Sequence, residues 1–115
     1  MEALIYVSLA LNTLVLSPIC FSMLRDAEWV NATWGPKTPA RGILFSIYTA
    51  ILLASLYFLT NPDPKMVLAL LCVQIVYKVT TPFTVGSFRH PVVVSNLAIS
   101  AIHLVTVVSI LPTLS

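Results

Sequence analysis

Among the polar side chains inside the apolar stretches of this 115-residue chain, six are of types that could do chemistry. Gln74 and Lys78 are four residues apart, so they share one face of a helix. A second group with spacings of four and three residues also shares a face, and it consists of Asn96, Ser100 and His103. Asn12 completes the set. The positive charge of Lys78 would favour an anionic or carbonyl-bearing ligand.

These side chains also have structural interpretations. The amides of Asn12, Gln74 and Asn96 are equally suited to hydrogen bonds that hold helices together in a membrane. Lys78 either lines a cavity or extends its ammonium group to the membrane surface along its own apolar stem. A neutral His103 bonded to a neighbouring helix is the alternative to a histidine that binds a ligand or a proton.

The elements that must position these residues are four apolar stretches. They cover residues 3–24, 42–60, 64–81 or 64–86, and 91–114, each near the ~20 residues needed to cross a bilayer as a helix. Hydrophobic residues make up 58% of the chain and charged residues 9%, which is far from the composition of a soluble domain. We therefore expect one all-α domain, an integral membrane four-helix bundle over residues 1–115 with up-down-up-down topology.

Prolines mark several helix boundaries. Pro39, Pro64 and Pro91 stand at the starts of apolar stretches, where the missing N–H has no intrahelical partner to lose. Pro82 lies inside the third stretch and removes the backbone bond to Lys78, so that helix ends near residue 81 or continues to residue 86.

The loop charges predict an orientation. Most Lys and Arg residues fall in the first and third loops, so both are expected to be cytoplasmic, with both termini on the other side of a membrane, which we expect to be a bacterial inner membrane. Trp29 and Trp34 lie in the first loop, where indole rings would anchor it at the level of the lipid headgroups.

Packing gives two further expectations. Because polar groups are costly in hydrocarbon, Asn12, Gln74 and His103 should meet near the middle of the membrane, with Lys78 at the level of Asn96 and Ser100. The second span carries a stripe of small residues that would let another helix approach closely, formed by Ser46, Ala50 and Ala54.

Motifs for catalysis are lacking. All four acidic residues lie in loops or at the N-terminus, and no phosphate-binding glycine loop or metal-ligand spacing is present. We therefore predict no metal or cofactor and no nucleic-acid partner. The hydropathy pattern resembles that of the small multidrug resistance transporters, whose first helix carries an embedded glutamate. Asn12 stands in this chain's first span instead, so that family's proton coupling is not predicted.

Three classes of function stay open. The first is a non-enzymatic accessory or assembly subunit that packs against other membrane proteins or against itself. The second is a small homo-oligomeric transporter or ligand-binding protein that uses the polar residues of its spans. The third is a membrane enzyme acting on a lipid or isoprenoid-like substrate.

Overall fold

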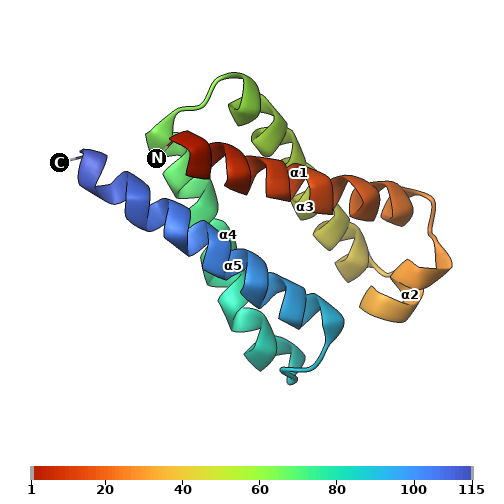
Figure 1. Cartoon of the computed structure of the whole chain (residues 1–115). Coiled ribbons are helices and arrows are strands. Elements are labelled where there is room, and N and C mark those ends of the chain that lie inside the picture. The colour runs from red at the N-terminus through yellow and green to blue at the C-terminus, as the bar shows by residue number, and fades with distance from the viewer. Residues whose placement is uncertain (1, 115) are drawn as a thin grey trace. The chain divides into compact units, whose positions relative to one another are not determined.

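The chain folds into helices, as expected. The computed structural model describes residues 2–114, and that part contains helices and no strand. In chain order the elements are α1 (Glu2–Leu24), α2 (Glu28–Trp34), α3 (Pro39–Thr60), α4 (Pro64–Val85), α5 (Pro91–Ile110) and the short 3-10 helix η1 (Leu111–Leu114) (Figure 1).

Four of these helices are long and apolar enough to cross a bilayer: α1, α3, α4, and α5 together with η1. They coincide with the four predicted spans, which marks the chain as a small multi-pass membrane protein. The sides of the membrane on which the loops and termini lie stay a prediction from the charge pattern.

Each proline-led helix has a side-chain cap. Thr38 Oγ1 accepts a hydrogen bond from the Arg41 N–H at 3.3 Å, and Asp63 Oδ1 accepts one from the Lys65 N–H at 3.0 Å. His90 Nδ1 does the same for Val92 at 3.2 Å, at the start of α5. These acceptors satisfy N–H groups that a helix N-terminus leaves without partners.

The third span takes the longer of its two predicted ends. Pro82 stands within α4, which continues to Val85 and ends at Gly86, whose φ of 81° suits a glycine in the left-handed region. The carbonyl of Lys78, deprived of the Pro82 N–H, accepts a hydrogen bond from Thr81 Oγ1 at 2.6 Å instead. A side chain thus replaces the backbone donor, and the helix continues past the proline.

The first loop differs from expectation because it contains a helix. Residues 25–41 form the polar segment between the first two spans, and within it Glu28–Trp34 forms α2. Asp26 reverses the chain just before it with a φ of 54°. Because α2 has only seven residues and Ala27 provides no side-chain cap, its local sequence signal is weak.

The described residues divide into two compact units, and α1 contributes to both. One unit holds the residues up to Ser8 and those from Asn61 onward, and in it α4 and α5 pack against each other. The other unit holds residues 9–60. Buried apolar side chains in the first include Val67, Leu71 and Val93, and in the second Leu9 and Val30.

Candidate functional site

The buried basic residue of α4 bonds to α5. Lys78 is 4% exposed, and its Nζ donates to Asn96 Oδ1 at 3.3 Å. Asn96 Nδ2 in turn donates to Thr81 Oγ1 at 3.4 Å, which closes a small group of hydrogen bonds between the two helices. The expected proximity of Lys78 and Asn96 is therefore observed, and Lys78 is buried rather than extended to the surface.

Among the described residues, no acidic side chain pairs with Lys78. The one ion pair within residues 2–114 joins Arg41 and Asp26, in the other unit. The ring of Tyr77 lies near Lys78, with its centroid 5.1 Å from Nζ. A buried ammonium group with only a neutral amide oxygen is incompletely compensated in a low-dielectric medium.

Ser100 lies on α5 one turn beyond Asn96, on the same buried face. Its side chain is 4% exposed, and its Oγ has no hydrogen-bond partner among the described residues. Most buried hydroxyl groups have a hydrogen-bond partner, so the Ser100 hydroxyl is free to bond to a polar atom of a ligand.

His103 belongs to a second polar group in the same unit. Its Nδ1 lies 3.0 Å from Ser8 Oγ, and Ser8 Oγ lies 2.7 Å from Thr106 Oγ1. Thr106 Oγ1 also donates to the Leu4 carbonyl at 3.2 Å. Sequence reasoning missed Thr106, although its three-residue spacing from His103 places it on the same face of α5.

Two further predicted residues are buried. Gln74 is completely buried on α4. Asn12 belongs to the other unit, where its Nδ2 donates to Ser55 Oγ at 3.1 Å. The expected meeting of Asn12 with Gln74 and His103 stays a prediction. Ser55 was overlooked because a single serine in an apolar helix carries little signal.

Arg41, at the start of α3, is enclosed by the loop that precedes it. The side chain is 6% exposed, and its NH2 group donates to Asp26 Oδ1 at 2.5 Å. Its NH1 group donates to the Gly35 carbonyl at 2.9 Å and to Asn31 Oδ1. Sequence reasoning counted Arg41 only as an orienting charge. Its structural role was missed because all three partners lie in the first loop, for which the sequence predicted no local structure.

The two tryptophans of this loop differ in environment. Trp29 is 45% exposed, whereas Trp34 is partly buried and lies edge-on to Tyr48 of α3, with ring centroids 6.3 Å apart. The two indole rings are 5.6 Å apart. Trp34 therefore packs α2 onto α3, and anchoring of Trp29 at the membrane surface stays a prediction.

The small-residue stripe lies away from the buried face of α3. That face contains Arg41, Tyr48, Ile51, Ser55 and Phe58. Ser46 and Ala50 are exposed and Ala54 is half-buried. Packing of another helix against this stripe stays a prediction, and the exposed positions leave room for a separate molecule.

No metal centre is indicated: within residues 2–114, no three His, Cys, Asp or Glu side chains gather as ligands of one ion would. Comparison with protein-family models, with curated proteins and with solved structures returned no match. The fold and the buried polar groups define a class, a small all-helical multi-pass membrane protein with a basic residue buried between two of its helices.

Proposed function

We propose that this protein binds a small anionic or carbonyl-bearing molecule at Lys78, between α4 and α5. The observation that carries the proposal is the burial of an ammonium group whose hydrogen-bond acceptor in this structure is one neutral amide oxygen. Ionisable residues inside a membrane are costly, and they are commonly kept where a substrate or ion must be bound.

Bond lengths support an exchange of partners at this position. The Lys78–Asn96 bond is 3.3 Å, longer than the ~2.7–2.9 Å typical of a hydrogen bond between an ammonium group and a carboxylate. A ligand carboxylate or phosphate could therefore replace Asn96 Oδ1 and gain a shorter, charge-assisted bond.

Ser100 supports a ligand with a second oxygen. Its buried Oγ lies on the same α5 face as Asn96 and has no partner in the described part of the chain. A carboxylate held by Lys78 could accept from Ser100 as well. His103, one turn further along, would limit the ligand to a few atoms in that direction.

Benzoate and its uncharged analogue benzamide provide a direct test. In detergent, saturating benzoate should raise the melting temperature of the wild-type protein, and benzamide should raise it less. Lys78→Met should abolish the benzoate shift, and Ser100→Ala should reduce it. Lys65→Met, at an exposed lysine near the start of α4, is the matched control and should keep the full shift. An equal benzoate shift in Lys78→Met and the wild type would rule out the proposal.

Transport of the ligand is the next step of this proposal. Proteoliposomes containing the wild-type protein should take up radiolabelled benzoate, and both Lys78→Met and His103→Leu should lose uptake while remaining folded. Binding without uptake would indicate a receptor or carrier-subunit role instead.

An accessory-subunit function is the second candidate, and the exposure of Ser46 and Ala50 favours it. Small residues facing outward allow close approach of a partner helix. Purification in mild detergent should then retain a larger membrane protein at fixed stoichiometry, and Ala50→Leu should release it. Recovery of only a monomer or homodimer would argue against this function.

A further inference from the structure

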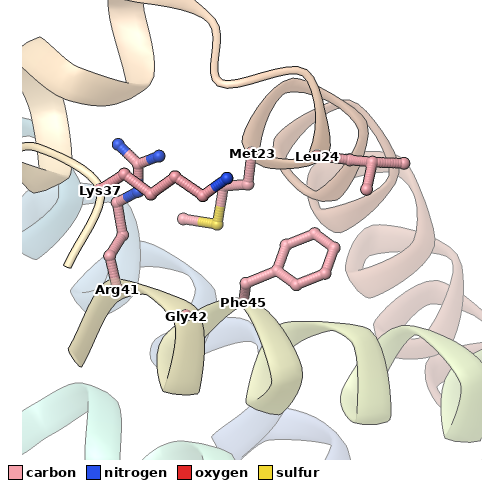
Figure 2. Close-up of a pocket in the computed structure, with 6 residues that line it drawn as sticks. All are labelled: Met23, Leu24, Lys37, Arg41, Gly42 and Phe45. Carbon is pink, nitrogen blue, oxygen red and sulfur yellow. The ribbon is translucent and has the colours of Figure 1, made fainter. Parts of the chain in front are cut away.

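A pocket of about 140 Å³ lies in the unit formed by residues 9–60, where the end of α1 approaches the start of α3. Its walls are formed by Met23, Leu24, Lys37, Arg41, Gly42 and Phe45 (Figure 2). Figure 2 shows the Lys37 side chain extending across the pocket beside Arg41, with the Phe45 ring on the other side.

The two basic residues of the pocket, Arg41 and Lys37, differ in whether their side chains have partners within the protein. Arg41 is held by Asp26, Asn31 and Gly35, so it forms a fixed wall. Lys37 is exposed and has no hydrogen bond or ion pair with any other residue of the described chain. Its ammonium group is therefore available to an anion from outside the protein.

The rest of the pocket lining is apolar, and the position of the pocket along the two helices indicates the kind of ligand. Met23, Leu24 and Phe45 belong to the ends of two helices long enough to span a membrane, so the pocket lies at the level where hydrocarbon gives way to headgroups. A free anion would use Lys37 but would gain nothing from these side chains. A molecule that combines an anionic group with an acyl chain would use both.

We propose that this pocket binds an anionic phospholipid, with its phosphate at Lys37 and the beginning of an acyl chain against Phe45 and Leu24. Basic pockets between membrane helices are suited to acidic headgroups, and each Lys near a bilayer surface strengthens that attraction. This inference is independent of ligand binding at Lys78.

Gly42 allows the pocket to be closed without disturbing the helix. It lies in the first turn of α3, its φ is not positive, and a Cβ atom built on it would meet nothing within 4 Å. A leucine at this position would place its side chain in the pocket, and removal of a glycine from a helix also favours folding.

Native mass spectrometry of the purified protein with equal amounts of phosphatidylglycerol and phosphatidylcholine tests the proposal. The wild type should retain phosphatidylglycerol preferentially. Lys37→Gln should weaken retention about fivefold, the factor expected for loss of one basic residue near the surface. Gly42→Leu should weaken it as well, although Lys37 is unchanged. Lys65→Gln, at an exposed lysine in the first turn of α4, is the matched control and should behave as the wild type.

Three results would overturn the proposal. Equal retention of the two lipids would show that charge plays no part. Equal behaviour of Lys37→Gln and Lys65→Gln would show that the pocket is not the site. Displacement of phosphatidylglycerol by millimolar inorganic phosphate, with no effect of Gly42→Leu, would indicate an anion site that does not recognise lipid. Lys78→Met should leave lipid retention unchanged, so this proposal and the one above fail separately.

Discussion

Arg41 and Lys78 are both buried basic residues, but their surroundings are opposite. Arg41 is 6% exposed and donates to a carboxylate, an amide oxygen and a backbone carbonyl, with a 2.5 Å bond to Asp26. Lys78 is 4% exposed and donates to one amide oxygen at 3.3 Å. The two side chains are similarly buried, but the charge of Arg41 is fully compensated by its partners, whereas that of Lys78 is only partly compensated.

This difference separates a structural charge from one that is kept available. The geometry of a guanidinium group suits several fixed acceptors, and Arg41 uses them to hold the loop between α1 and α3 in one conformation. An ammonium group is a compact donor that can change partners easily. Removing Arg41 should therefore damage the fold, whereas removing Lys78 should mainly damage binding.

The largest expected effect is on stability at Arg41. Arg41→Met should lower the free energy of unfolding by about 3 kcal/mol, because Asp26, Asn31 and the Gly35 carbonyl all lose their donor. Because Asp26 is about half exposed, this decrease in the free energy of unfolding lies at the lower end of the range for buried ion pairs. Chemical denaturation in detergent micelles measures it, with Lys65→Met as the control. Equal stability of Arg41→Met and Lys65→Met would show that Arg41 does not stabilise the fold more than an exposed lysine does.

A smaller effect is expected at Thr81. Thr81→Val should cost about 1–2 kcal/mol, because both the Lys78 carbonyl and the Asn96 amide lose their hydrogen-bond partner. Thr80→Val is the matched control, since Thr80 is exposed and bonds only to the Tyr77 carbonyl. The same denaturation assay compares them, and equal losses would mean that the α4–α5 hydrogen bonds contribute little.

The smallest effect on stability is expected at Lys78 itself. Lys78→Met should change the free energy of unfolding by less than about 1 kcal/mol, because the lost bond to Asn96 is offset by removal of a poorly compensated buried charge. The benzoate shift should vanish in the same sample. A loss of stability as large as that of Arg41→Met would assign Lys78 to the fold.

The sequence was sufficient for the four spans and their starts, because hydropathy and a proline at the first helical position are local signals. It also placed Lys78 near Asn96, since polar groups in hydrocarbon must find one another. It was insufficient for α2, which is short and lacks a side-chain cap. It also missed Ser55 and Thr106, because a hydroxyl group acquires a role only when a partner on another helix faces it.

Pro82 has a consequence for the direction of the hydrogen bonds that join Thr81 and Asn96. Because proline leaves the Lys78 carbonyl without its backbone donor, the single hydroxyl proton of Thr81 points to that carbonyl. Thr81 can then only accept from Asn96, so the amide of Asn96 must turn its NH2 group to Thr81 and its oxygen to Lys78. The ammonium group of Lys78 can only donate, so it requires the same orientation of the Asn96 amide. A residue without an N–H and a buried lysine thus favour one and the same direction of these hydrogen bonds.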